Sequence, residues 1–146
     1  MNIQSPTAVL LPAIGRPSIR VPLFSHAVPA GFPSPADDYV EGRLSLDEHL
    51  IANKDATFFV RARGKSMEGA GIQDGNILVV DKSITPKSGS IVVAFVDGEY
   101  TVKTFIKRAG KIVLRPENPS FSEIEFKDGQ ELQVWGVVVG TVKKYV

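Results

Sequence analysis

Residues 90–108 read SIVVAFVDGEYTVKTFIKR and decide the fold of this 146-residue chain. SIVVAFV is an apolar run with the length of a buried strand. Asp97-Gly98 follows it, and this dipeptide is a strong signal for a two-residue hairpin turn. We therefore expect SIVVAFV and EYTVKTFIK to form neighbouring antiparallel strands, with a register that the tight turn fixes.

Further strand patterns lie on both sides of this hairpin. They are TFFVRA from Thr57, NILVVD from Asn76, KIVLRP from Lys111 and ELQVWGVVVGTVKKYV from Glu131. Turns that end in glycine precede the last two runs, at Ala109-Gly110 and Asp128-Gly129. Short strands at this spacing predict a mainly β chain with a compact, partly closed fold.

The chain before the β region has a different composition. Seven of the ten prolines fall early in the sequence, at Pro6, Pro12, Pro17, Pro22, Pro29, Pro33 and Pro35. Proline at this density prevents helices and removes donors from sheets, so we expect residues 1–35 to form an extended arm. Residues 36–146 are expected to form the packed domain. One short helix is predicted in LSLDEHLIA, residues 44–52, with Ser45 as its N-cap.

The composition excludes several kinds of chemistry. The chain has no cysteine, which rules out disulfides, thiol catalysis and cysteine-based metal sites. Its only histidines are His26 and His49, so we expect no metal and no other cofactor. A net charge of +1 provides no strong field for nucleic acid or an acidic membrane. No apolar run is long enough to span a membrane, and the early AVLLPAIG segment makes a poor secretion signal, which predicts a cytoplasmic protein.

The segment RGKSMEGAGIQDG, residues 63–75, places Ser66 in a glycine-rich turn after a strand. It does not fit a phosphate-binding loop, because that motif needs glycine where Phe59 stands and a helix afterwards. A Ser-His-Asp triad would need His26 or His49, which both precede the β region. Ser66 is therefore either an ordinary turn residue or a nucleophile paired with a lysine.

Lys103 is the lysine that best fits such a base. A lysine accepts a proton only when it is neutral, and burial among apolar neighbours lowers its pKa. Lys103 lies in the strand EYTVKTFIK, with Val102, Phe105 and Ile106 nearby. On composition alone, a strand lysine facing water remains the simpler interpretation, as a polar turn does for Ser66.

Two longer segments carry a family resemblance. GKSMEGAGIQDGNILVVDKS, followed by DGEYTVKTF, resembles the self-cleaving Ser-Lys peptidases of the bacterial DNA-damage response, the LexA and UmuD family. In that family Gly-x-Ser-Met precedes a Gly-Ile-x-Asp-Gly turn, and a Thr-Val-Lys strand follows some 37 residues after the serine. Ser66 and Lys103 are 37 residues apart here, and LRPENPSF at 114–121 also resembles a family segment.

The resemblance implies a compact LexA-like β-fold and specific roles for residues. Ser66 would be the nucleophile and Lys103 the general base. Backbone N–H groups of Ser66 and Met67 would form the oxyanion hole. The family cuts its own chain between Ala or Cys and Gly, which corresponds here to the Ala30-Gly31 bond.

The short arm resembles the UmuD branch, accessory subunits of error-prone translesion polymerases. Only 30 residues precede the predicted bond and no helix-turn-helix fits them, so we expect no sequence-specific DNA binding. The resemblance implies a homodimer, a RecA–single-stranded DNA filament that promotes cleavage, and the catalytic subunit of a translesion polymerase as partner. The alternatives are a non-enzymatic β-domain that binds partners, or a LexA-related transcriptional regulator without its own DNA-binding domain.

Overall fold

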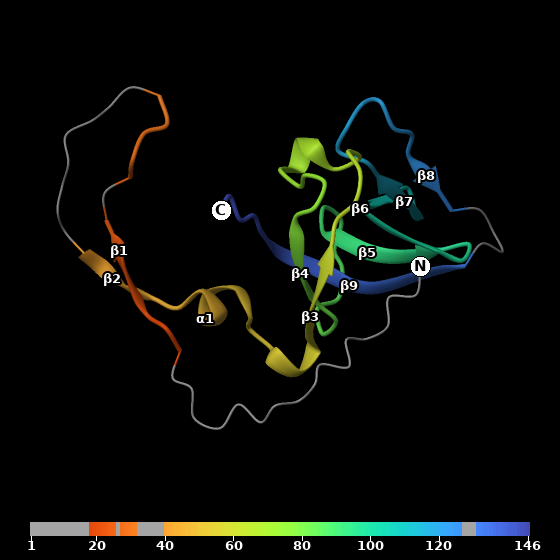
Figure 1. Ribbon diagram of the computed structural model, residues 1–146. Helices are drawn as coiled ribbons and strands as arrows, with labels where there is room; N and C mark the ends of the chain where they lie inside the picture. Colours follow the sequence, from red (N-terminus) through yellow and green to blue (C-terminus); the bar gives the residue numbers. More distant parts are fainter. Residues whose placement is uncertain (1–17, 26, 32–39, 127–130) are drawn as a thin grey trace. The chain divides into compact units, whose positions relative to one another are not determined.

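The computed structural model describes residues 18–25, 27–31, 40–126 and 131–146. Within these ranges the chain forms two compact units that divide after Ala52. Strands dominate both units and helices are few and short, so the predicted mainly β fold is confirmed (Figure 1). The predicted boundary between arm and domain, at residues 35 and 36, lies outside the described residues and stays a prediction.

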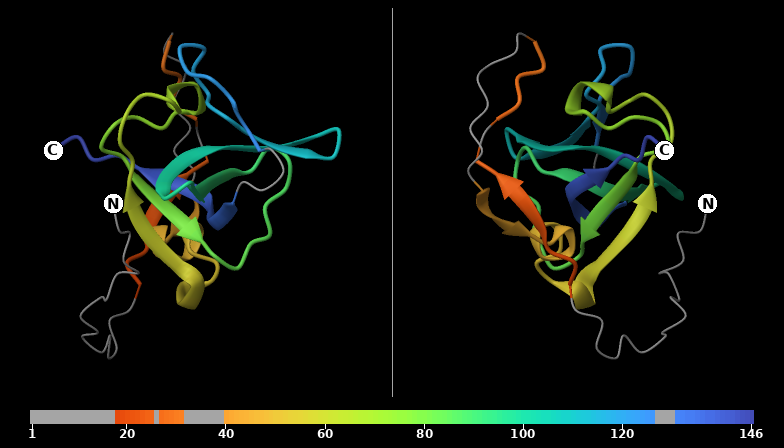
Figure 2. Two further views of the ribbon diagram at one scale, coloured as in Figure 1. Left: turned by 90° about the vertical axis from the view of Figure 1, so that its right-hand side faces the viewer. Right: turned by 60° about the vertical axis from the view of Figure 1, so that its left-hand side comes forward.

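The larger unit is built on an antiparallel sheet with the strand order β3-β4-β9-β5-β6-β7-β8. The strands are β3 (Thr57–Arg61), β4 (Ile77–Asp81), β5 (Ile91–Val96), β6 (Glu99–Arg108), β7 (Lys111–Arg115), β8 (Ile124–Glu125) and β9 (Leu132–Val142). Two short 3-10 helices accompany them, η1 (Lys54–Ala56) and η2 (Glu68–Ala70). The long last strand β9, blue in Figure 2, pairs with β4 and β5 and so joins the two halves of the sheet.

The predicted hairpin at Asp97-Gly98 is confirmed. β5 and β6 pair without a register shift from Val96 opposite Glu99 to Ile91 opposite Thr104. Both turn residues have positive φ, 46° for Asp97 and 86° for Gly98, as a type I′ turn requires. This tight turn fixes which side chains of β6 share a face.

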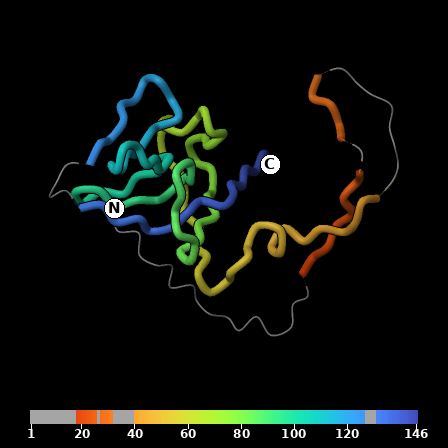
Figure 3. Tube along the Cα trace, turned by 180° about the vertical axis from the view of Figure 1, so that it is seen from behind, coloured from red at the N-terminus to blue at the C-terminus, as the bar shows by residue number. Residues whose placement is uncertain are grey.

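Two loops of the larger unit lie side by side. One connects β3 to β4 and contains η2, and the other connects β7 to β8. Figure 2 and Figure 3 show them as neighbours, lime and light blue, and a backbone hydrogen bond of 2.7 Å from Gly69 N to Glu117 O joins them.

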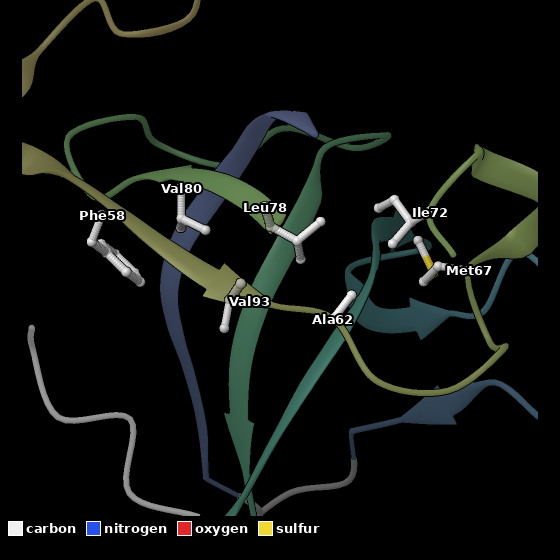
Figure 4. Close-up of a cluster of buried hydrophobic side chains, with 7 residues drawn as sticks. All are labelled: Phe58, Ala62, Met67, Ile72, Leu78, Val80 and Val93. Atoms are coloured by element: carbon white, nitrogen blue, oxygen red, sulfur yellow. The ribbon is translucent and has the colours of Figure 1, made fainter. Parts of the chain in front are cut away.

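The core of the larger unit consists of two hydrophobic clusters, with β5 contributing to both. Val93 belongs to the first cluster, whereas Val92 and Ala94 belong to the second, because successive side chains of a strand point to opposite faces. The first cluster, drawn in Figure 4, contains Phe58, Ala62, Met67, Ile72, Leu78, Val80 and Val93. The second contains Val92, Ala94, Phe105, Leu114 and Val137. Met67 therefore fastens the glycine-rich loop into the first cluster.

The smaller unit contains β1 (Val21–Phe24) and β2 (Val40–Leu44), which pair antiparallel, and the helix α1 (Leu46–Leu50). Ser45 caps α1 as predicted, since its side chain accepts a hydrogen bond from Glu48 N at 3.5 Å, although the helix is shorter than its sequence pattern. Arg20 and Glu48 form an ion pair at 2.7 Å. No helix in the described ranges is long and apolar enough to cross a membrane.

Gly136 of β9 provides a test of how closely the strands pack. A Cβ at this position would lie 2.6 Å from Val80 Cγ1 and 3.1 Å from Asp81 O. Gly136→Ala should therefore lower the free energy of unfolding by about 1–3 kcal/mol, measured by urea denaturation. Gly42→Ala, in strand β2 with no atom within 4 Å of the added Cβ, is the control and should change little. Equal effects of the two substitutions would contradict the packing argument.

Candidate active site

Ser66 lies in the loop between β3 and β4, whose shape depends on glycine and on one carboxylate. Gly64 and Gly71 have φ values of 89° and 82°, a region that residues with a Cβ rarely adopt. Asp74 Oδ1 accepts a hydrogen bond of 2.7 Å from Gly64 N and so closes the loop. Because Met67 is 3% exposed, the residue directly after Ser66 is anchored in the core.

Lys103 lies in the middle of β6, and its side chain reaches Ser66. The distance from Lys103 Nζ to Ser66 Oγ is 3.0 Å, which is hydrogen-bond length. The two residues come from segments that the sheet brings together across 37 positions of sequence. The structure thus places the two predicted catalytic side chains in contact.

Two further groups surround the amine. Lys103 Nζ donates to Thr101 Oγ1 at 2.8 Å and to the Val102 carbonyl at 3.0 Å. A neutral amine has two N–H donors and one lone pair, so these two acceptors can take both donors and leave the lone pair for the Ser66 hydroxyl. The three contacts are therefore compatible with an amine that accepts the proton of Ser66.

Burial lowers the pKa of Lys103 from its ordinary value of 10.5. Desolvation has this sign for a lysine because it disfavours the charged form. No carboxylate within the described residues forms an ion pair with this amine, so no neighbouring anion offsets the effect. The site therefore favours the neutral amine more than water does.

A cavity of about 790 Å³ opens beside the pair. Its walls come from β3, from the loop that carries Ser66, and from β6. The lining mixes apolar side chains such as Val60 and Val102 with the polar groups of Ser66, Thr101 and Lys103. A cavity with apolar walls and a few convergent polar groups can hold a peptide segment against the serine.

The backbone N–H groups of Ser66 and Met67 lie next to the nucleophile. Glu68 N donates to Lys65 O and Gly69 N to Glu117 O, but the N–H groups of Ser66 and Met67 have no acceptor among the described residues. Free N–H groups next to a nucleophile are the usual donors for an oxyanion. Their role as an oxyanion hole stays a prediction.

Ala30 and Gly31, the predicted cleavage site, lie in the smaller unit. Both residues are exposed, and a Cβ added at Gly31 would meet nothing within 4 Å. The structure therefore shows an accessible peptide bond, and its cleavage stays a prediction.

Thr101, Glu117 and Asn118 received no role from the sequence, although Glu117 and Asn118 lie in LRPENPSF, a segment that resembles the family. Thr101 could have been found, because it lies two positions before Lys103 and so shares its face of β6. The contacts of Glu117 and Asn118 with the Ser66 loop join positions about fifty residues apart, and no local pattern predicts them. Among the described residues, no group of three or more His, Asp or Glu side chains could hold a metal ion.

A known protein family matches most of the chain. The model of the peptidase S24-like family matches residues 22–139. The chain belongs to this family. The prediction of the LexA and UmuD family from GKSME and TVK is thereby confirmed.

Curated relatives of the family resemble the chain over most of its length. Protein SamA from Salmonella typhimurium is 46% identical over 123 residues, 84% of this chain and 85% of SamA. Protein ImpA from Escherichia coli is 42% identical over 125 residues, 84% of this chain and 83% of ImpA. The LexA repressor from Geobacter metallireducens is 38% identical over 127 residues, 86% of this chain and 62% of the repressor.

The lowered pKa of Lys103 predicts how stability depends on pH. Between the lowered value and 10.5, the unfolded chain binds more protons at this lysine than the folded chain does. The free energy of unfolding should therefore rise with pH across this window. Lys103→Met should remove that part of the rise, measured by urea denaturation at several pH values in a Ser66→Ala background.

Lys107→Met, at an exposed position of the same strand, is the matched control and should keep the rise. An unchanged pH dependence in Lys103→Met would show that this amine is not desolvated in the folded chain.

Proposed function

We propose that the chain is a serine endopeptidase that cuts its own Ala30-Gly31 bond with a Ser66-Lys103 dyad. The observation that carries this proposal is the 3.0 Å contact between Ser66 Oγ and Lys103 Nζ at a cavity wall. Membership of the peptidase S24-like family supports it, since the family match includes both residues. The proposal also includes the domain organisation: residues 1–35 form the arm that is cut, and residues 36–146 form the peptidase domain.

The proposed reaction proceeds through an acyl-enzyme. Ser66 Oγ attacks the Ala30 carbonyl carbon while neutral Lys103 takes the hydroxyl proton. Backbone N–H groups of Ser66 and Met67 stabilise the oxyanion. The C–N bond to Gly31 then breaks, and Lys103 returns the proton to the departing amine. Water, deprotonated by the same amine, releases residues 1–30 and restores Ser66.

We propose that this cleavage belongs to the bacterial DNA-damage (SOS) response. The UmuD-like pattern in the sequence supports a role in which the trimmed chain takes part in translesion DNA synthesis and mutagenesis. The partners in this proposal are a second copy of the chain, a RecA–single-stranded DNA filament that promotes cleavage, and the catalytic subunit of a translesion polymerase. A RecA–single-stranded DNA filament and a translesion polymerase act in the bacterial cytoplasm, and we propose the same location for this chain.

The similarity to a LexA repressor favours a second candidate, a transcriptional regulator that lacks its own DNA-binding domain. The chain covers 62% of that repressor. A regulator of this kind would act by binding another protein. It would change reporter transcription even as a Ser66→Ala variant, whereas the proposed role in mutagenesis would be lost.

The dyad predicts the pH dependence of cleavage. Only neutral Lys103 accepts the Ser66 proton, and burial lowers its pKa, so the rate should rise with pH and level off once that lowered value is passed. Lys103→Arg should be inactive throughout, because a guanidinium stays charged, and Ser66→Ala should be inactive because the attacking oxygen is gone. The rates are measured on purified protein from about pH 6 to about pH 11, with and without a RecA filament. A flat wild-type profile or an active Arg variant would exclude Lys103 as the base.

The bond itself predicts the ends of the products. Mass spectrometry of the wild-type products should find one fragment that ends at Ala30 and one that begins at Gly31. Gly31→Glu should block cleavage by placing a large charged side chain beside the scissile bond, and it should leave the fold intact because a Cβ there meets nothing. Gly42→Ala is a control whose cleavage should be normal. A fragment that begins elsewhere would show that another bond is cut.

A further inference from the structure

The Ser66 loop is fastened on both sides of the serine by two neighbouring residues of the β7–β8 loop. Asn118 Nδ2 donates a hydrogen bond of 2.8 Å to Lys65 O, directly before Ser66. Gly69 N, three positions after Ser66, donates a hydrogen bond of 2.7 Å to Glu117 O. The backbone that carries the nucleophile is thus held at both ends by one short segment.

The same segment is also fixed to the strand that carries the lysine. Glu117 Oε1 accepts a hydrogen bond of 2.7 Å from Thr104 Oγ1. Thr104 is 4% exposed and directly follows Lys103, so the two side chains leave β6 on opposite faces. Arg115 completes the arrangement by donating to the same carboxylate oxygen at 3.1 Å from Nε and 2.9 Å from its terminal nitrogen.

These contacts are close and leave little freedom. A Cβ on Gly69 would lie 2.4 Å from Glu117 O, so the two backbones are closer than a residue with a side chain would allow. Asn118 is itself held, because its Oδ1 accepts a hydrogen bond of 3.0 Å from Ser120 N. The amide that faces Lys65 therefore has a fixed orientation.

The Ser66 loop depends on such contacts because it has little regular structure of its own. Its helical part is the three-residue η2, and Gly64 and Gly71 permit backbone conformations that other residues avoid. The sheet fixes Lys103 directly, whereas Ser66 lies outside the strands and is held through the contacts of its loop, with Met67 in the first hydrophobic cluster as one of them. A displacement of about 1 Å between reacting groups can slow a reaction about a hundredfold.

We propose that Glu117 and Asn118 are positioning residues that set the distance between Ser66 Oγ and Lys103 Nζ. Asn118 and the Glu117 backbone hold the serine segment, and the Glu117 carboxylate holds β6 through Thr104. This inference rests on the proposed function only in the test that measures the rate of self-cleavage.

Two substitutions of nearly unchanged shape test the two halves of this arrangement. Asn118→Asp keeps the acceptor for Ser120 N but replaces the donor to Lys65 O with an oxygen. Thr104→Val removes the hydroxyl that binds Glu117. Each should slow self-cleavage about tenfold to a hundredfold at the high-pH plateau. The pH of half-maximal rate should stay constant in Thr104→Val, which adds no charge near Lys103.

Glu123→Ala is the matched control. Like Glu117, Glu123 accepts hydrogen bonds from an arginine, with 3.2 Å contacts to Arg108 of β6, but no hydrogen bond among the described residues joins its side chain to the Ser66 loop. The Glu123→Ala variant should cleave itself at the rate of the wild type. A normal rate in both Asn118→Asp and Thr104→Val, or an equal loss in Glu123→Ala, would overturn the proposal.

Two variants of Glu117 separate position from charge. Glu117→Gln keeps an oxygen that can accept the hydrogen bond from Thr104, so it should retain most of the self-cleavage rate. Glu117→Ala removes that oxygen, so its self-cleavage rate should fall as far as that of Thr104→Val. If Glu117 acted on Lys103 through its charge, Glu117→Gln would instead shift the pH of half-maximal rate downward with an unchanged plateau. That outcome would also overturn the proposal.

Hydrogen exchange distinguishes this inference from the proposed function. In a Ser66→Ala background, which does not cleave under the proposed mechanism, the Gly69 amide should exchange about tenfold faster in Asn118→Asp and Glu117→Ala than in Glu123→Ala. A wild-type chain that never cleaves would refute the peptidase proposal, while this exchange result would still decide whether the two residues hold the loop. Unchanged exchange of Gly69 in both variants would overturn the positioning role.

Discussion

In the contact between Ser66 and Lys103, a half-buried amine has hydroxyl and carbonyl groups as its only described hydrogen-bond partners. A charged lysine in such a place is unfavourable, so the surrounding structure must supply both the position and the desolvation. The sheet does so by placing Lys103 in the middle of β6, opposite Val92 of β5 and directly before Thr104, where the pairing with β7 begins. The loop does so by burying Met67, which holds the adjacent serine near the amine.

Much of this arrangement could be predicted from local sequence. Asp97-Gly98 specifies the β5–β6 hairpin, because few other residue pairs adopt positive φ at two successive positions. The position of β6 after this turn, with the alternation of side chains along a strand, then places Thr101 and Lys103 on the same face of β6. Thr101 could therefore have been predicted from the sequence as a neighbour of the amine. The serine and lysine motifs identified the family, because both residue types and their spacing were present together.

The remaining features depend on contacts between distant parts of the chain. The order of the sheet, with β9 between β4 and β5, follows from no single motif and is set by packing, as at Gly136 against Val80. The hydrogen bonds of Glu117 and Asn118 join loops that carry only turn-like sequences. A polar turn residue looks the same in sequence whether it faces water or another loop, so its partner appears only in the folded chain.

Under the proposed self-cleavage, the lowered pKa of Lys103 has a further consequence. An ordinary enzyme compensates for a small neutral fraction of its base by turning over many times, but a chain that cuts its own arm reacts once. Under the proposed reaction, the fraction of molecules with a neutral amine multiplies the rate constant of that single event. The environment of one amine would then set the lifetime of the uncut protein, and each tenfold change in the neutral fraction would change that lifetime about tenfold. Residues that adjust the desolvation of Lys103 would thus regulate how long the full-length form persists.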